Sequence, residues 1–206
     1  MFCWKWTSRD PSPSPVMVLK VSAFSCDWWA IDYEGRAYLI LQLYGCTDIP
    51  NDGVKWHPDK IFSEIRRIET EHRWLKGKCI EGVADPSIWD ASRGEAIIEA
   101  ADRHFVYFSR GDNKRIPGWM QCHYRMGFDT EGKPMVYFFN TCRAAIRTLP
   151  LLQFSEINPE DLDTDDEDHF ADSFRFHTLP FHIYEISTAL LILANGLNTK
   201  LSMQKR

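Results

Sequence analysis

Apolar residues recur with different periods along the chain, and the period separates expected strands from expected helices. A short apolar run at 16–21 predicts a strand. Segments 27–32 and 36–44 follow, and the turn residues 33–35 between them predict a hairpin. From 58 to 75, isoleucines recur at helical spacing among charged residues, which predicts an amphipathic helix.

The second half of the chain alternates between helical and strand patterns. An apolar run at 78–84 ends at Asp85-Pro86, because proline lacks a backbone N–H and restricts the residue before it. This pattern predicts a strand with Asp85 at its carboxyl end. Further along, helices are predicted over 94–104, 117–126, 141–149 and about 168–177, and strands over 105–108 and 135–139.

This order of strands and helices predicts an α/β fold, with a mixed sheet flanked by helices. The length of 206 residues and the 44% hydrophobic content allow a sizeable core, so a fully disordered chain is excluded. Residues 1–15 carry three prolines and no periodicity, which predicts an irregular leader. We therefore expect one domain over 16–180, followed by a C-terminal helix and tail over 181–206.

The net charge of -5 hides an uneven distribution. Residues 156–168 include eight acids and no base, so the remainder of the chain has a small positive charge. Six cysteines lie far apart without a CxxC pair, which argues against a disulfide framework and a zinc ribbon. The longest apolar stretch, 189–194, is too short to span a bilayer. These features predict a protein of a reducing cytoplasm with no membrane partner.

Three acidic residues could form a metal site. Asp85 follows a predicted strand, at the edge where α/β sheets bind ligands, although aspartate before proline is also a common strand exit. Asp168 and Asp172 are spaced i and i+4 on a predicted helix and share a face, with His169 beside them. Oxygen ligands without thiolate favour Mg²⁺ or Mn²⁺, and a two-metal site of this kind supports phosphodiester hydrolysis.

The acidic segment allows two other interpretations. Most charge runs are solvated loops, which is the preferred interpretation for 161–167. A calcium loop would place Asp161, Asp163 and Asp165 at its first, third and fifth positions. Its sixth position should be Gly and is Asp166, and its twelfth should be Glu and is Asp172, so the calcium loop is disfavoured.

Basic residues interleave with aromatic residues between 110 and 125, and two more arginines share a face of the next predicted helix. Basic groups can contact phosphates, while aromatic faces can stack on bases or pack in the core. Core packing is the better explanation for Trp119, and an ordinary solvated face explains the last two arginines nearly as well. The candidate DNA-binding residues are Arg110, Lys114, Arg115, Arg125, Arg143 and Arg147.

Four blocks in this order resemble the C-terminal nuclease domain of the large subunit of tailed-phage terminases. The resemblance extends over about 22–180. The blocks are DWWAIDYEGRAYLILQLYG (27–45), GVADPSIWDASRGEAI (82–97), KRIPGWMQCHYRMGFDTEGKPMVYFFNTCRAAIRTLP (114–150) and DTDDEDHFADSFRF (163–176).

This resemblance implies a ribonuclease-H-like fold and a metal-dependent endonuclease that cuts concatemeric double-stranded phage DNA during genome packaging. It also implies association with a small terminase subunit and the portal protein, in the cytoplasm of a bacterial host. The ADPS block supplies one catalytic carboxylate, here Asp85. The DHxxD block corresponds to Asp168, His169 and Asp172, with Asp172 the preferred metal ligand.

Two departures from the family affect the expected activity. The ATPase domain that precedes the nuclease domain in the family is absent, so translocation is not expected of this chain. The family opens its first strand with an aspartate, and the corresponding position is Met17, a thioether that cannot replace a carboxylate toward a hard cation. Asp27 lies ten residues on, in the neighbouring strand region, and could substitute only if the backbone allowed it. The alternative is a catalytically inactive DNA-binding or portal-docking remnant, from a truncated or frame-disrupted prophage gene.

Overall fold

The computed structural model describes part of the chain. Most of the expected leader and the whole of the expected C-terminal helix and tail lie outside it. None of the helices in the described part is long and apolar enough to cross a membrane. The described residues are 14–17, 23–47, 49, 52–92, 94–163 and 167–176.

The described residues form a six-stranded mixed sheet in the order β5-β4-β1-β2-β3-β6. Strands β1, β2 and β3 pair antiparallel in sequence order. On one side β4 pairs parallel to β1 and β5 parallel to β4, and on the other side β6 pairs parallel to β3. The expected α/β class with a mixed sheet is confirmed. The strands are β1 (Ser14–Met17), β2 (Ser25–Ile31), β3 (Ala37–Tyr44), β4 (Glu81–Ala84), β5 (Ser109–Arg110) and β6 (Val136–Phe138).

The expected hairpin is β2 followed by β3. Its turn is held by Asp32, whose Oδ1 accepts hydrogen bonds of 2.9 Å from the backbone N–H groups of Glu34 and Arg36. Gly35 has a φ of 79°, which favours glycine over other residues. Local turn chemistry therefore fixes the register of these two strands.

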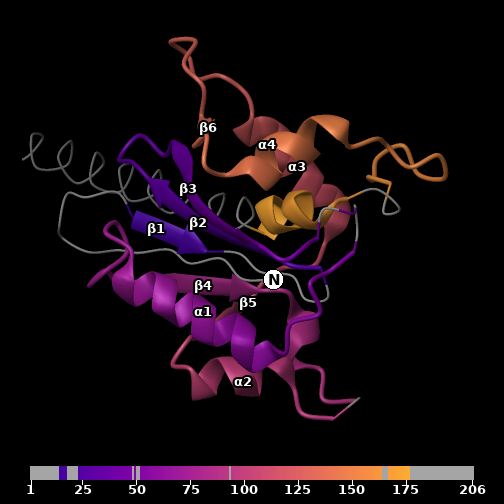
Figure 1. Ribbon diagram of the computed structural model, residues 1–206. Helices are drawn as coiled ribbons and strands as arrows, with labels where there is room; N and C mark the ends of the chain where they lie inside the picture. Colours follow the sequence, from indigo (N-terminus) through magenta and orange to yellow (C-terminus); the bar gives the residue numbers. More distant parts are fainter. Residues whose placement is uncertain are drawn as a thin grey trace, which may run out of the picture.

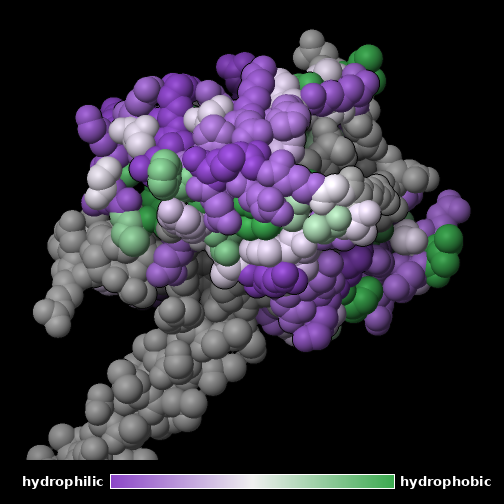
Figure 2. Space-filling view, turned by 90° about the horizontal axis from the view of Figure 1, so that it is seen from below, coloured by the Kyte–Doolittle hydropathy of each residue, from purple (hydrophilic) through white to green (hydrophobic). Residues whose placement is uncertain are grey.

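Two helices cover one face of the sheet, α1 (Pro58–Glu71) and α2 (Ile97–Arg103), as the lower part of Figure 1 shows. Proline in the first turn of α1 suits the fixed φ of that residue. The buried side chains of α1 include Ile61, Phe62 and Ile65, and they pack with Trp28 of β2 in one core cluster. Figure 2 shows the molecule from this side, where hydrophilic residues predominate and hydrophobic residues occur in small separate groups.

The opposite face is covered by α3 (Arg115–Arg125), α4 (Arg143–Thr148) and a further helix over residues 169–176 (Figure 1). We call the last of these the 169–176 helix. Trp29 of β2 stacks on Phe174 of this helix, with ring centroids 5.3 Å apart. Both belong to a second buried cluster that also contains Trp119, which confirms that Trp119 is a core residue. The sheet is thus covered on both faces.

Two strands differ from the prediction. Over 105–108 there is no strand, because Phe105 and Val106 terminate α2 with backbone hydrogen bonds to Asp102 and Ala101, and β5 begins only at Ser109. The first strand begins at Ser14, inside the expected leader, and residues 18–22 of its apolar run lie outside the described part.

Candidate functional site

Asp85 lies where the sequence predicts, immediately after β4. It is the N-cap of a short 3-10 helix, η1 (Pro86–Trp89), and its Oδ1 accepts a hydrogen bond of 2.8 Å from the N–H of Ser87. A carboxylate in this position satisfies a backbone donor that the helix leaves unpaired. One oxygen of Asp85 is therefore engaged in a local structural bond.

The 169–176 helix approaches the same end of β4. The N–H of Gly111, just after β5, donates a hydrogen bond of 2.7 Å to the carbonyl of Ala84. A Cβ at Gly111 would lie 2.3 Å from the ring of Phe176 and 3.1 Å from that carbonyl oxygen, so only glycine allows this approach. Asp172 precedes Phe176 by four residues and shares its helix face. Asp172 thus lies one helical turn from a residue that packs near the carboxyl end of β4, where Asp85 lies.

Asp172 is paired with two arginines. The residue is 4% exposed, and its Oδ1 lies 3.5 Å from Nη1 of Arg115 and 3.4 Å from Nη2 of Arg175. Two guanidinium groups at Oδ1 of this carboxylate place positive charge beside the oxygen and repel a divalent cation. The preferred metal ligand is therefore already neutralised by charges of this chain.

The other two members of the DHxxD block lie beside each other. Asp168 is buried, and Nδ1 of His169 lies 3.5 Å from its Oδ1. The ring of His169 faces that of Tyr44 on β3, with centroids 6.5 Å apart. These contacts place His169 near β3, with the buried Asp168 beside it.

The residues present do not fit the expected two-metal site. Within the described residues, no three His, Cys, Asp or Glu side chains converge in a way that could hold a metal ion. Strand β1 reads Ser-Pro-Val-Met over 14–17, and Met17, the position at which the resemblance implies an aspartate, is paired with Gly82 of β4. The magnesium or manganese ligands predicted from the sequence are thus not assembled as a set.

Asp27 is engaged in structural contacts. It is fully buried on β2, where its carboxyl accepts hydrogen bonds from Ser25, from Gln42 of β3 and from Ser173 of the 169–176 helix. Burial raises the pKa of Asp27 to about 7, and the three hydrogen bonds only partly offset this effect. A carboxyl enclosed in this way links two strands to a helix, so its contacts in this structure are those of a structural residue.

The acidic segment is less solvated than predicted at its two ends. Both oxygens of Asp161 accept hydrogen bonds of 3.1 Å from Nε of Arg115, and Oδ1 also accepts one of 2.7 Å from Nε1 of Trp119. Glu167 accepts two hydrogen bonds of 2.7 Å from Arg147. An Asp161 carboxylate bound to Arg115 and Trp119 also argues against the calcium loop, whose predicted Asp165 lies outside the described residues.

The six candidate DNA-binding residues divide into three groups: exposed residues, residues held by carboxylates, and one buried residue. Arg110, Lys114 and Arg143 are exposed, and the Arg110 guanidinium lies 4.9 Å from the centroid of the Trp89 ring. Arg115 and Arg147 are held by Asp161, Asp172 and Glu167, as described above. Arg125 contradicts the prediction, because it is 8% exposed and Nη1 donates a hydrogen bond of 3.4 Å to the carbonyl of Gly35. A buried guanidinium cannot contact phosphate.

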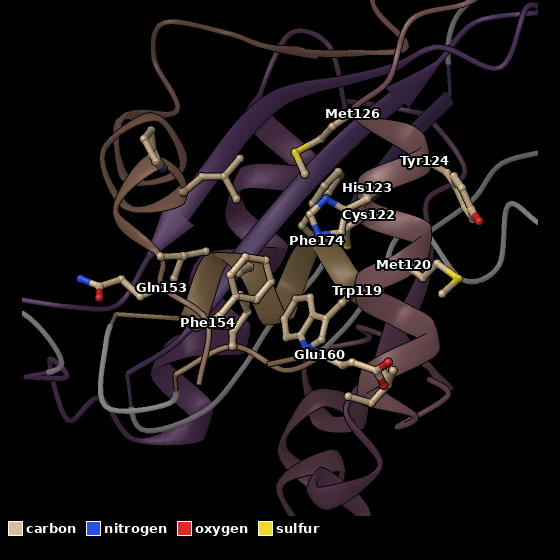
Figure 3. A pocket seen from close by; sticks show the side chains of 16 residues that line it. Trp119, Met120, Cys122, His123, Tyr124, Met126, Gln153, Phe154, Glu160 and Phe174 are labelled. Atoms are coloured by element: carbon tan, nitrogen blue, oxygen red, sulfur yellow. The ribbon is translucent and has the colours of Figure 1, made fainter. Parts of the chain in front are cut away.

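A groove that the sequence does not indicate lies between α3 and the segment 149–162. Its volume is about 650 Å³, and its lining is mostly apolar. Figure 3 shows Trp119, Phe154 and Phe174 around this space, while Tyr124 points away from it. Its residues come from elements far apart in the sequence, so no local motif marks it.

Family models, curated proteins and solved structures were compared with this chain, and none matches it.

Proposed function

We propose that this chain is a DNA-binding module of the terminase nuclease type, with a ribonuclease-H-like fold and an incomplete hydrolytic centre. An antiparallel three-stranded meander, extended from its first strand by two parallel strands and covered by helices on both faces, supports this fold. The order of the four sequence blocks supports the family.

The state of Asp172 is the observation that carries the proposal. A metal ion at this carboxylate would have to compete with Arg115 and Arg175, both fixed by the surrounding fold. Removing the arginines would take two charged partners away from a nearly buried carboxylate, which is costly. The arginines therefore stabilise the fold in the place where a nuclease needs an open coordination site.

DNA would be held at the carboxyl ends of β4 and β5. Arg110 is the last residue of β5, Lys114 follows the strand, and both are exposed. Lys114 forms an ion pair of 3.0 Å with Asp112 that a phosphate could replace. Such contacts depend on charge and are insensitive to base sequence. Moderate affinity that falls steeply with salt is the expected property.

Two measurements on the same preparation test this proposal. Binding of duplex DNA, followed by fluorescence anisotropy, should weaken as salt rises, and plasmid DNA should remain intact with Mg²⁺ or Mn²⁺. Salt-insensitive binding, or none, would overturn the DNA-binding role and favour portal docking.

A competent endonuclease is the second candidate, since Asp172 lies one helical turn from a residue that packs near the carboxyl end of β4, where Asp85 lies. Metal-stimulated nicking that is lost in both Asp85→Ala and Asp172→Ala would establish it. Nicking that persists in those variants would indicate a contaminating nuclease, and the non-cleaving role would stand.

A further inference from the structure

A second cavity lies at the opposite end of β4 from Asp85. It has a volume of about 610 Å³ and is bounded by the C-terminal half of α1, by residues 77–80 before β4, and by Phe105 and Tyr107 after α2. Because residues 77–80 precede β4 and Asp85 follows it, the two sites are separated by the length of this strand. The cavity belongs to neither the expected metal centre nor the groove of Figure 3.

Glu69 is a carboxyl in a position that suits a core residue. It continues the buried stripe of α1 after Ile61 and Ile65, is 7% exposed, and lines the cavity. Within the described residues its carboxyl has one hydrogen bond, a long one of 3.4 Å from Nε1 of Trp28 to Oε1. Burying a carboxyl with so little compensation is unfavourable, so packing alone does not explain a glutamate here.

Phe105 occupies a backbone conformation that normally belongs to glycine. It follows the C-cap of α2, its φ is 58°, and the backbone hydrogen bonds of Phe105 and Val106 to Asp102 and Ala101 form a Schellman motif. The ring of Phe105 is not buried in return for this strain, since the residue is 64% exposed. Tyr107, two residues later, is 54% exposed. Strain that leaves two aromatic rings at the mouth of a cavity is a feature of ligand-binding sites.

We propose that this cavity binds a nucleobase together with its phosphate. Phe105 and Tyr107 offer faces for stacking, and the Glu69 carboxylate accepts a hydrogen bond from an amino group of the base. Arg66 and Lys78 line the same cavity and supply positive charge for the phosphate. The ligand is a free nucleotide or a nucleotide of single-stranded DNA. This site needs no metal and goes beyond the DNA contacts proposed at the other end of β4.

Cytosine and thymine nucleotides form a matched pair of probes. Cytosine presents an amino group at position 4, where thymine presents an acceptor oxygen. At pH 8 the Glu69 carboxyl is largely ionised, since its pKa is about 7, and it can only accept. Calorimetry on the whole chain should give binding of deoxycytidine monophosphate that is about 5-fold or more tighter than that of deoxythymidine monophosphate.

An oligodeoxycytidylate distinguishes the two sources of the ligand. Tighter binding of the oligomer than of the mononucleotide identifies single-stranded DNA, and equal or weaker binding identifies a free nucleotide. Failure of both to bind, or equal affinity for the cytosine and thymine nucleotides, would overturn the proposal. Neither result depends on whether the chain cleaves DNA.

Two variants test the residues. Glu69→Gln should abolish the preference for cytosine, because the amide can also donate to the oxygen of thymine. Phe105→Gly should weaken binding of both nucleotides about 5-fold or more while raising the melting temperature, since glycine relieves the positive φ. Weaker binding by a more stable protein cannot result from unfolding.

Phe128→Ala removes an exposed ring elsewhere and serves as the control. Unchanged affinity in Phe105→Gly would contradict the assignment.

Discussion

Gln42 of β3 donates a hydrogen bond of 2.7 Å from Nε2 to Oδ1 of Asp27, its direct partner on β2. The Oε1 of the same glutamine accepts a hydrogen bond of 3.1 Å from the N–H of Ala145 in α4. A buried carboxyl and a partly buried amide therefore connect the hairpin to a helix that begins a hundred residues later in the chain. This connection has consequences for the pH dependence of stability.

The contribution of Asp27 to the free energy of unfolding should fall as pH rises from about 4 to 7. The ordinary pKa of this carboxyl is 3.8 and its pKa in the folded protein is about 7. Between these values the unfolded chain binds fewer protons than the folded protein, so the free energy of unfolding decreases, by at most on the order of 4 kcal/mol. Urea unfolding at pH 5 and pH 8 measures the effect.

Asp27→Asn is the matched control for this pH dependence. The amide keeps the shape and most hydrogen bonds but does not titrate. The variant should therefore lose less free energy of unfolding than the wild type when the pH is raised from 5 to 8. Parallel pH profiles of the two proteins would show that Asp27 does not titrate as its environment indicates.

Arg115→Met should destabilise the protein by about 2 kcal/mol, because it leaves Asp161 and Asp172 without a shared cation in a partly buried region. Chemical denaturation measures this loss. Lys114→Met is the neighbouring control, since its ion pair with Asp112 is exposed, and its effect should stay within about 0.5 kcal/mol. Equal effects of the two changes would show that the Arg115 pairs are no stronger than a surface contact.

Gly111→Ala should cost about 1–3 kcal/mol, because the added methyl group meets the Phe176 ring and the 169–176 helix has to shift. The melting temperature reports this cost. Phe176→Leu should make the same alanine change less costly by opening space. A cost that is identical in both backgrounds would mean that Phe176 is not the obstacle.

If Arg110 contacts a phosphate, Arg110→Ala should weaken duplex DNA binding uniformly across sequences. It should also reduce the magnitude of the slope of log affinity against log salt by about one. The slope of log affinity against log salt provides the measurement. Arg67→Ala on α1 removes an exposed arginine paired with Glu64 and Glu71, and should leave that slope unchanged. Equal slopes for wild type and Arg110→Ala would exclude this contact.

Local patterns were sufficient for much of the fold. The hairpin follows from alternating apolar residues and a Tyr-Glu-Gly turn, and α1 follows from isoleucines at helical spacing. Strand β5 has only two residues, both exposed, and such a segment has no hydrophobic period to detect. The position of Asp85 was predictable, because the proline that stops β4 is adjacent in sequence.

The partners of the candidate site residues could not be predicted in the same way. Arg115 meets Asp161 across 46 residues of chain, and only the packing of α3 against the later loop brings them together. Two signals were nevertheless present in the sequence. Arg125 follows Trp119 and Cys122 at intervals of three, which places it on the buried side of α3. Glu69 follows Ile65 by four residues, which places a carboxyl on the apolar face of α1.

Within the described part of the chain, the outermost strands of the sheet are β5, with two residues, and β6, with three. A long open edge exposes a row of unpaired amide groups to which a foreign strand can attach, and this is a common origin of aggregation. Here each edge offers an incoming strand only a very short row of amide groups. Strands β5 and β6 are therefore poor templates for strand addition, even though the central hairpin of the sheet is rich in residues that favour β structure.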